Sequence, residues 1–530
     1  MNSTQILSVI LLVAFFALMI IVGYRTRKKA TDVNGFVLGD RGVGPWLTAF
    51  AFGTSYFSAV IFVGYAGQFG WNFGLASTWA GLGNAFIGSL LAWNILGRRT
   101  RVMTQHLDAK TMPDYFGKRF SSKGLKIAAS IIVFIFLIPY TASLYNGLSS
   151  LFGMVFNIPY WVVIAVMAIL TGIYVIVGGY MATAVNDFIQ GIIMLFGIVA
   201  VIFAVLHDNG GLVEAAKSLS AISDASTEGW TGGAFTSFFG PDPLALLFVV
   251  ILTSLGTWGL PQMVGKFYAI KSEDDIHKGT VISTIFAIIV AGGCYFLGGF
   301  GRLYADKITY NPQTGAPLFD TIVPSMLSTL SGVIIAVVIV LVLSASMSTL
   351  SSLVLTSSST FTLDIVKAMS KKEMSDKKQV SIMRIFIIFF IVVSAAIAIF
   401  KDSHPTVTFI AQMMGVSWGA LAGAFLAPYM YSLYSKKITK LATAVCFVWG
   451  CGIAVLQLVI TLGGIDISSW GPVLAYIFKS SINSGVIAMV GGLVIVPIVS
   501  LITPKPDKKL VDDCFSCYKK KTEEIEKTKY

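Results

Sequence analysis

A dense run of hydroxyl side chains stands inside an otherwise apolar stretch of this chain. It reads LSASMSTLSSLVLTSSST from Leu343 to Thr360, and thirteen of its eighteen residues are Ser, Thr, Ala or Met. Ser344, Ser348 and Ser352 follow one another at i, i+4 spacing, so one face of a helix here would be polar. Several uncharged oxygens on one face suit a small monovalent cation, because they bind it weakly enough to release it.

Ser348 and Thr349 are the strongest candidate cation ligands of this run, since Thr349 lies on the stripe next to Ser348. The same hydroxyls could instead bond to carbonyls of their own helix or allow close helix packing. We favour that second interpretation for Ser357 to Ser359. For Ser348 and Thr349 the residue pattern alone leaves both interpretations open.

A single acidic residue, Asp187, stands in the stretch GGYMATAVNDFIQG, where it is expected to open an apolar helix. A carboxylate in such a place suggests a functional site, because burying a charge in a membrane is costly. The alternative is structural, since a helix N-terminus attracts a negative side chain.

Two apolar runs that are distant in the sequence contain helix-breaking residues. The first reads AFGTSYFSAVIFVGYAG from Ala51 to Gly67, and the second reads LTSLGTWGLPQMVGKF from Leu252 to Phe267. Broken helices at membrane depth occur where they face protein or a watery cavity, and their free ends can bind substrate and ion. The two runs lie five apolar segments apart, an odd number, so two halves that begin with them would have opposite orientations. This arrangement predicts an inverted-repeat transporter.

Composition places the whole chain in a membrane. Of its 530 residues 55% are hydrophobic and only 12% are charged, and the mean hydropathy is +0.80. A spanning helix needs roughly 20 apolar residues, and the chain is predicted to be all-α with about thirteen spans. The predicted spans are Ile6–Tyr24, Trp46–Gly67, Trp71–Leu96, Leu125–Phe156, Trp161–Val177, Phe188–Leu206, Leu244–Phe267, Val281–Phe300, Ile322–Thr360, Met383–Phe400, Val407–Leu433, Leu441–Leu462 and Val486–Ile502.

The basic residues predict the orientation of these spans. Of the 38 Lys and Arg residues, 33 fall in alternate connections and in the tail after Thr503. Because Lys and Arg accumulate on the cytoplasmic side, we expect the N-terminus outside and the C-terminus in the cytoplasm of a multi-pass plasma (inner) membrane protein. The net charge of +12 is thereby assigned to the membrane's inner face, with no nucleic-acid partner.

Four stretches resemble the sodium/solute symporter family, most closely its bacterial sodium/proline and sodium/pantothenate branches. They are MPDYFGKRF from Met112, GGYMATAVNDFIQG from Gly178, GLPQMVGKFYA from Gly259 and MSTLSSLVLTSSS from Met347. The resemblance implies the leucine-transporter-like fold, with two inverted five-helix repeats and extra helices at both ends. The expected division is 1–44, an extra helix and basic loop; 45–206, the first repeat; 207–243, an extracellular loop; 244–433, the second repeat; 434–503, extra helices; and 504–530, a basic cytoplasmic tail.

The resemblance also implies a sodium ion as the coupling ion, with a ligand set for it. The family's central sodium site would correspond to the carbonyls of Thr54, Phe57 and Ala345 and the hydroxyls of Ser348 and Thr349. This favours the cation-ligand interpretation of the two hydroxyls.

A second sodium site occurs in some members of the family. Its counterparts here would be Asp187, Ser351 and Ser352. Because all three residue types are present, one and two sodium ions both remain open from the sequence.

The solute-contact candidates lie at the two interruptions and on one further helix. They are Ser55, Ser58, Tyr140, Thr253, Thr257, Trp258 and Pro261. Where the proline symporter has an acidic residue this chain has Tyr56, and where it has two aromatics this chain has Thr253 and Thr257. These departures resemble the pantothenate branch, whereas Tyr140 matches the proline branch. For Trp258 an aromatic gate or plain lipid contact is an equal alternative.

Together these features predict a symporter that imports a small organic solute, such as proline or pantothenate, with sodium by alternating access. No enzyme motif is present in the sequence. The alternatives are proton coupling through Asp187, a transport-linked sensor, or a passive channel. The solute and the oligomeric state stay open.

Overall fold

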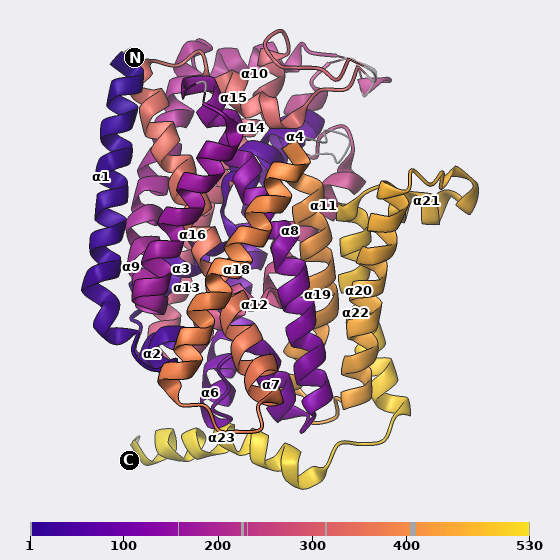
Figure 1. Ribbon diagram of the computed structural model, residues 1–530. Coiled ribbons are helices and arrows are strands. Elements are labelled where there is room, and N and C mark those ends of the chain that lie inside the picture. Colours follow the sequence, from indigo (N-terminus) through magenta and orange to yellow (C-terminus); the bar gives the residue numbers. More distant parts are fainter. Residues whose placement is uncertain are drawn as a thin grey trace.

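The computed structural model describes residues 3–156, 158–223, 227–230, 232–312, 315–402 and 410–528. In these ranges the chain forms an upright helical bundle (Figure 1), with α1 along one side and α23 lying across the lower end. Helices of the first half are α1 (Ser3–Thr26), α2 (Val33–Leu38), α3 (Pro45–Tyr56), α4 (Ala66–Phe73), α5 (Thr78–Gly83), α6 (Arg98–His106), α7 (Met112–Arg119), α8 (Lys123–Phe156), α9 (Tyr160–Asp208) and α10 (Leu212–Ser220).

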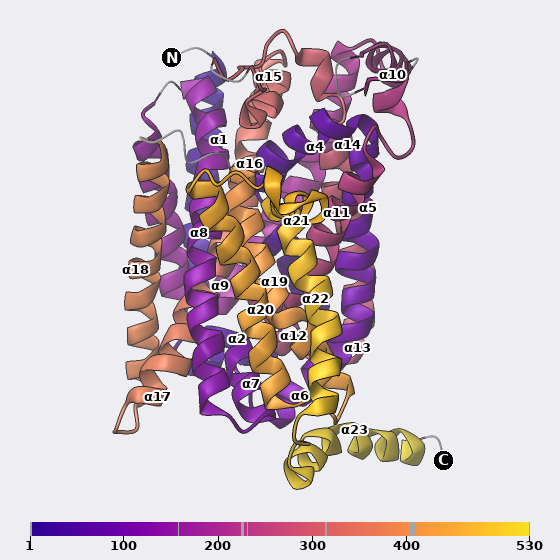
Figure 2. The ribbon, with the colours of Figure 1, turned by 90° about the vertical axis from the view of Figure 1, so that its right-hand side faces the viewer.

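The second half continues the bundle and adds helices at its outer side. Its helices are α11 (Pro243–Leu255), α12 (Pro261–Ala269), α13 (Asp274–Ala287), α14 (Gly293–Gly298), α15 (Ile322–Leu327), α16 (Gly332–Thr360), α17 (Lys367–Met369), α18 (Asp376–Asp402), α19 (Ile410–Tyr434), α20 (Lys440–Leu462), α21 (Pro472–Phe478), α22 (Ser481–Ile502) and α23 (Lys508–Thr528). Figure 2 shows α20 and α22 in front of α19, and both pack against it.

The described residues contain 10 helical runs long and apolar enough to cross a membrane, or 11 with the bent pair α11 and α12. Two of these runs, Val60–His106 and Tyr160–Asp208, have 47 and 49 residues, far more than one span needs. Val60–His106 holds the end of the predicted span Trp46–Gly67 and all of Trp71–Leu96, and Gly74, of positive φ, lies inside the latter. Tyr160–Asp208 holds two predicted spans that lie on either side of Gly179, which also has a positive φ. The sequence therefore predicts about thirteen spans where the described residues form 10 or 11 runs, because each of these two long runs was divided between two predicted spans.

α3 ends one residue before Phe57, whose backbone is extended (φ −84°, ψ 106°), and helical structure resumes at Val60. Gly53, one of the potential helix breakers in the run Ala51–Gly67, lies inside α3 and does not mark the break. A Cβ there would come 2.4 Å from the Phe286 ring, so this glycine allows α13 to pack closely. The second interruption is as predicted: Leu260 is extended, and α11 and α12 are bent by 47° at this point.

Asp187 was expected at the start of a helix, but the structure places it inside α9. The helix runs from Tyr160 and breaks at Gly179 (φ 54°, ψ −145°), where a Cβ would press against Phe36. Helix resumes directly after Gly179, so Asp187 lies about two turns inside it. The carboxylate is therefore too far from the helix start to be explained by the dipole of a first turn.

α16, which carries the hydroxyl run, lies at the centre of the bundle. It packs against α1, α3, α8, α9, α12 and α18. Its residues from Leu341 to Leu355 are all buried. A hydroxyl face can persist there because it meets other helices instead of lipid.

Lys266 lies on α12, and its side chain is only 4% exposed. The 33 basic residues counted on the inner side include Lys266, near the end of the predicted span Leu244–Phe267, but α12 packs against α3 and α16. This lysine is therefore an interior residue.

An ion-pair network joins α7 and α8 to Asp364, in the helical segment Phe361–Val366 that directly follows α16, at the lower end of the bundle. Lys126 Nζ lies 2.7 Å from Asp114 Oδ1 and 3.1 Å from Asp364 Oδ1. The Thr111 hydroxyl donates to Asp364 Oδ2 at 2.5 Å, and Lys118 lies 3.2 Å from Asp114. These contacts fix the short helix α7 against the central helix.

Candidate functional site

Five oxygen atoms from two distant parts of the chain meet beside the break in α3. They are the carbonyls of Thr54, Phe57 and Ala345 and the hydroxyls of Ser348 and Thr349. The Thr349 hydroxyl lies 3.1 Å from the oxygens of Thr54 and Ala345 and 3.4 Å from that of Phe57. The Ser348 hydroxyl lies 3.2 Å from the Thr54 oxygen and 3.1 Å from that of Ala345. The structure thus brings all five predicted ligands together.

The break in α3 is what exposes the carbonyls of Thr54 and Phe57. The last carbonyls of a helix lack the amide four residues on that would pair them, and α3 stops at Tyr56. Thr54 would otherwise bond to the amide of Ser58, but that residue lies outside the helix. The hydroxyls of α16 are the groups that face the free oxygens.

The chemistry of this set suits one monovalent cation. A hydroxyl can turn its hydrogen away and offer a lone pair, so all five atoms can act as ligands. All five residues are buried, and none of them carries a charge. Divalent cations favour carboxylates, whereas neutral oxygens hold a single charge loosely enough for release.

A second buried polar cluster lies around Asp187, and the chain itself supplies a cation there. Lys266 Nζ lies 3.7 Å from Asp187 Oδ2 and donates to Ser352 Oγ at 3.0 Å. Ser352 Oγ in turn lies 2.8 Å from Ser55 Oγ. Ser55, predicted to contact solute, therefore belongs to this cluster.

Ser351, the third residue predicted for a second sodium, makes a different contact. Its hydroxyl donates to the carbonyl of Ser348 on the same helix at 2.9 Å. The neighbouring Met347 carbonyl accepts from the Tyr174 hydroxyl at 3.1 Å. Of the predicted trio, Asp187 and Ser352 share a partner in Lys266, while Ser351 bonds to its own helix.

Three buried polar groups, those of Ser58, Tyr140 and Trp418, gather next to the α3 break. Tyr140 lies edge-on to Trp418, with ring centroids 6.1 Å apart at 86°, and its hydroxyl lies near both Ser58 and Trp418. Among the described residues, none of these three polar atoms meets a hydrogen-bond partner of acceptable geometry. Unpaired buried donors are costly, so they indicate a place where a ligand's acceptors bind.

The other solute candidates on the second interruption are directed elsewhere. Thr253 bonds to the Val249 carbonyl at 2.9 Å. The Thr257 hydroxyl lies 3.2 Å from the carbonyl of Gly88, and the Trp258 ring nitrogen donates to that of Ile87 at 3.0 Å. Trp258 is only 5% exposed, so lipid contact is wrong for it. Thr257 and Trp258 thus hold the second interruption against the helical segment Asn84–Leu91.

Pro261 begins α12 and lines a small cavity next to the second cluster. The cavity measures about 50 Å³, and its lining includes Lys266, Ser352, Lys110 and Thr111. This volume holds more than one water molecule. It lies between the Lys266 cluster and α7, which is at the lower end of the bundle (Figure 1).

A larger cavity of about 300 Å³ lies at the upper part of the bundle, around α4, α11 and α22 (Figure 2). Its lining is polar at several points, with Gln68, Asn72, Asp242 and Lys479. The two cavities lie toward opposite ends of the bundle, with the broken helices between them.

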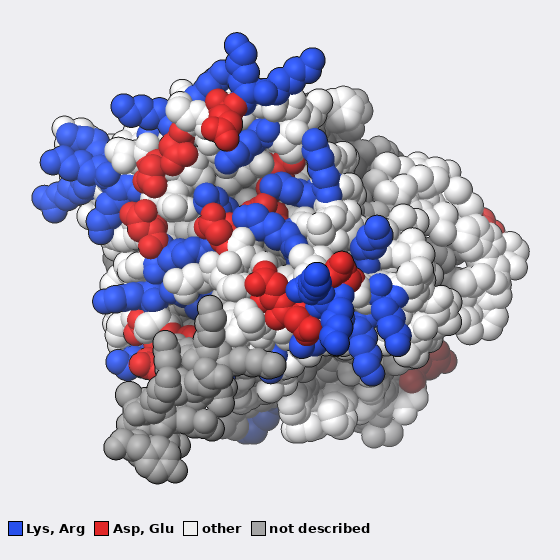
Figure 3. Space-filling view, turned by 90° about the horizontal axis from the view of Figure 1, so that it is seen from below, with Lys and Arg blue, Asp and Glu red and all other residues white. Residues whose placement is uncertain are grey.

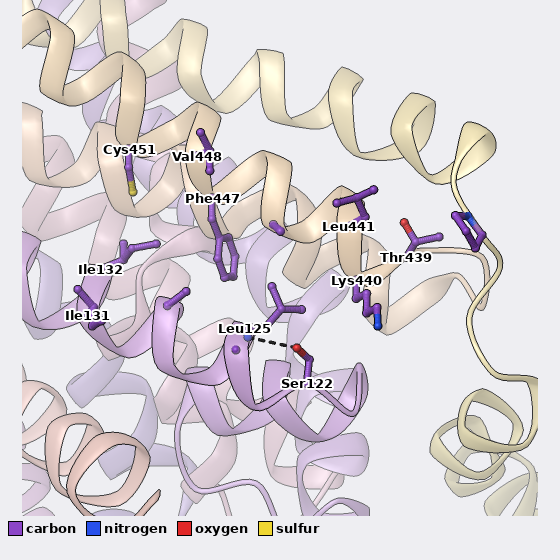
Figure 4. A pocket seen from close by; sticks show the side chains of 14 residues that line it. Ser122, Leu125, Ile131, Ile132, Thr439, Lys440, Leu441, Phe447, Val448 and Cys451 are labelled. Atoms are coloured by element: carbon purple, nitrogen blue, oxygen red, sulfur yellow. Dashed lines mark hydrogen bonds between the residues drawn. The ribbon is translucent and has the colours of Figure 1, made fainter. Parts of the chain in front are cut away.

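A further cavity, of about 820 Å³, is a different kind of surface. It is a groove between α8 and α20 into which Leu125, Ile132 and Phe447 project (Figure 4). Its few polar groups lie at the lower edge, where Ser122 accepts the amide of Leu125 at 3.3 Å. None of the predicted site residues lines it. An apolar groove on the outside of a spanning bundle faces acyl chains.

Two site residues were missed in the sequence. Lys266 could have been identified from the sequence, since it lies within the interrupted run that ends at Phe267. A charged side chain in such a run is expected to pair with an opposite charge. Trp418 could not have been identified in this way, because an aromatic residue in an apolar helix usually serves only to pack against its neighbours.

The sequence profile of the Sodium:solute symporter family matches residues 36–450. The chain belongs to this family. It is 28% identical over 505 residues to the "Osmoregulated proline transporter OpuE" of Bacillus subtilis (strain 168), covering 93% of this chain and 94% of that protein. It is 26% identical over 508 residues to a "Sodium/proline symporter" of Staphylococcus aureus, covering 94% and 93%.

The fold is also found in solved structures. A Na⁺-coupled sialic acid symporter in an outward-open state matches with a TM-score of 0.69 at 16% identity, covering 95% of this chain and 99% of that one. The predicted all-α, leucine-transporter-like fold is thereby confirmed. Family membership makes the protein a multi-pass membrane symporter that couples a solute to sodium.

Proposed function

We propose that this protein imports a small amino acid of the proline class together with sodium, by alternating access across the plasma (inner) membrane. The observation that carries the proposal is the meeting of five neutral oxygens between the α3 break and α16, with the Thr349 hydroxyl within 3.4 Å of three carbonyls. In this proposal Thr54, Phe57, Ala345, Ser348 and Thr349 hold the transported sodium ion.

Sodium would couple to solute through the shape of α3. An ion bound to the carbonyls of Thr54 and Phe57 fixes the break, and Ser58, one residue further on, then faces Tyr140 in a defined position. When sodium leaves toward a low-sodium cytoplasm, the break loses its ligand and the solute groups move apart. A ligand shifts such an equilibrium by its difference in affinity for the two states.

The solute site would use the unpaired donors of Ser58, Tyr140 and Trp418. Two hydroxyls and a ring N–H can all donate to one carboxylate, a group that proline and pantothenate share. The two relatives reported above are named for proline, and their similarity covers almost the whole chain, which favours proline. Tyr56, Thr253 and Thr257 differ from the proline pattern, so a related amino acid is the second choice.

The proposed cycle also requires a membrane orientation and two repeats. We assign 45–206 and 244–433 to the inverted repeats, with the N-terminus outside and the C-terminus in the cytoplasm. The lower face, which carries α23, is rich in Lys and Arg (Figure 3), as expected of a cytoplasmic surface. The cavity with Gln68 and Asp242 would then be the outer entrance.

Uptake of labelled proline into proteoliposomes, with and without an inward sodium gradient, tests this function. We expect accumulation that requires sodium and is not replaced by a proton gradient alone. Labelled pantothenate is the matched comparison. Uptake that ignores sodium would contradict the coupling, and sodium-driven uptake of pantothenate but not proline would contradict the solute assignment.

A further inference from the structure

A lysine ammonium occupies the position that the family resemblance assigned to a second sodium ion. Lys266 Nζ lies 3.7 Å from Asp187 Oδ2 and 3.0 Å from Ser352 Oγ. It also lies 5.3 Å from the centre of the Tyr180 ring, an orientation that favours a cation. Asp187 and Ser352 are both buried, at 0% and 2% exposed.

We propose that Lys266 is a built-in cation that takes the place of the second sodium, so that this protein moves one sodium ion per solute. The inference rests on the proposed function, because it concerns the ion count of that same transport cycle. It is independent of which solute is carried.

The charge balance of the cluster supports this assignment. Asp187 and Lys266 form a neutral buried pair, and a buried charge is tolerated when it is paired. A sodium ion added beside Asp187 would face the ammonium at close range in a medium of low dielectric, where like charges repel strongly. The pair and a second sodium therefore exclude each other.

Lys266 also makes the contacts between helices that an ion would make. Asp187 comes from α9, Ser352 from α16 and Lys266 from α12, and Ser55, which lies against Ser352, comes from α3. The ammonium thus links both broken helices to the two helices that hold the ion sites. Because it is covalently attached, this cation stays in place in every step of the cycle.

The neighbouring cavity gives a reason for a cation that is covalently attached to the chain. Lys266 and Ser352 both line the space of about 50 Å³ that extends toward Lys110 and Thr111 at the lower end. A free ion at this position could leave through that space, whereas the lysine cannot. A second transported charge would multiply the attainable ratio of inside to outside solute concentration by more than about tenfold at roughly 100 mV. By taking the place of that charge, the lysine limits this concentration ratio.

The test counts sodium ions bound to the purified full-length protein, using ²²Na⁺ alone. We expect one ion for the wild type and two for Lys266→Ala, which frees the Asp187 carboxylate and leaves space beside it. Lys266→Arg keeps the cation and should still bind one. The double variant Lys266→Gln with Asp187→Asn removes both charges together and should fold and bind one.

Each outcome decides between this inference and its rivals. Two ions bound to the wild type would overturn it, as would a folded Lys266→Ala protein that binds only one. If Lys266→Ala does not fold, the double variant decides: one ion with wild-type affinity supports the proposal, and weakened binding makes Asp187 a sodium ligand and overturns it. A wild type that binds no sodium would instead contradict the proposed function.

Discussion

The hydroxyl of Thr349 on α16 lies 3.1 Å from the carbonyl oxygen of Thr54 on α3, although 295 residues separate them in the chain. The first group comes from an unbroken helix and the second from a helix that stops two residues later. Their contact joins the hydroxyl run to the first interruption. It is the centre of the proposed sodium site.

Thr349→Ala should weaken sodium dependence more than solute selectivity. The change removes one of five oxygens, and losing a buried polar contact costs roughly 1–2 kcal/mol, or about tenfold in sodium affinity. The measurement is solute uptake against sodium concentration. Ser358→Ala is the matched control, because that hydroxyl bonds to the Leu355 carbonyl of its own helix. Equal loss of sodium and solute affinity in a folded Thr349→Ala protein would count against the site.

Tyr140→Phe and Trp418→Phe should each raise the solute KM by about tenfold, since each removes one donor to the solute. Sodium binding in the absence of solute should be unchanged. Tyr145→Phe on the same helix is the control, because Tyr145 is equally buried and its hydroxyl lies near Ser394 of α18. If all three variants behave alike, the donors of Tyr140 and Trp418 do not recognise solute.

Gly259→Ala should destabilise the protein and slow transport. A Cβ at Gly259 would come 2.7 Å from the backbone of Ala422 on α19, and such overpacking costs about 1–3 kcal/mol. Gly265→Ala, six residues on, meets nothing within 4 Å and should leave stability unchanged or slightly improved. Thermal unfolding in detergent, together with initial uptake rates, compares the two. Unchanged stability of Gly259→Ala would mean that α11 and α12 can move away from α19 at no cost.

Asp114→Asn should lower stability at pH 7 by about 1–3 kcal/mol, because it breaks a mostly buried ion pair. Burial raises the pKa of the Asp114 carboxyl, but the ammonium groups of Lys126 and Lys118 outweigh it and hold the pKa below its usual value. A depressed pKa stabilises the fold above the unfolded-state pKa of about 3.9, and this contribution is lost as pH falls through the lower folded value.

The variant should therefore lose less stability than the wild type when the pH falls below about 4. Unfolding measured from pH 7 down to pH 3 provides the comparison. Asp108→Asn is the control, since the Asp108 carboxylate is 67% exposed. Aspartate and asparagine both tolerate the left-handed backbone conformation at position 108. A wild-type acid transition that Asp114→Asn leaves unaltered would show that another carboxyl dominates.

Local features of the sequence were enough to predict the class of protein, the spans and the two interruptions. Runs of about 20 apolar residues must cross a membrane as helices, and glycine, proline and hydroxyl residues within such runs must face protein or water. The residue pattern made Ser348 and Thr349 candidate cation ligands, and the family resemblance added the carbonyls of Thr54, Phe57 and Ala345. Packing of the interrupted α3 against the hydroxyl face of α16 brings these five groups together.

Only the tertiary structure decided which side chains from distant segments contact one another. The sequence assigned Lys266 to a connection, Ser55 to the solute and Asp187 to a helix start, yet packing of α3, α9, α12 and α16 brings all three to one buried cluster. Trp418 likewise acquired its place beside Tyr140 through the packing of α19 on α8. Helical periodicity determines which face a residue occupies, whereas the partner it meets depends on how whole helices cross, which no local pattern records.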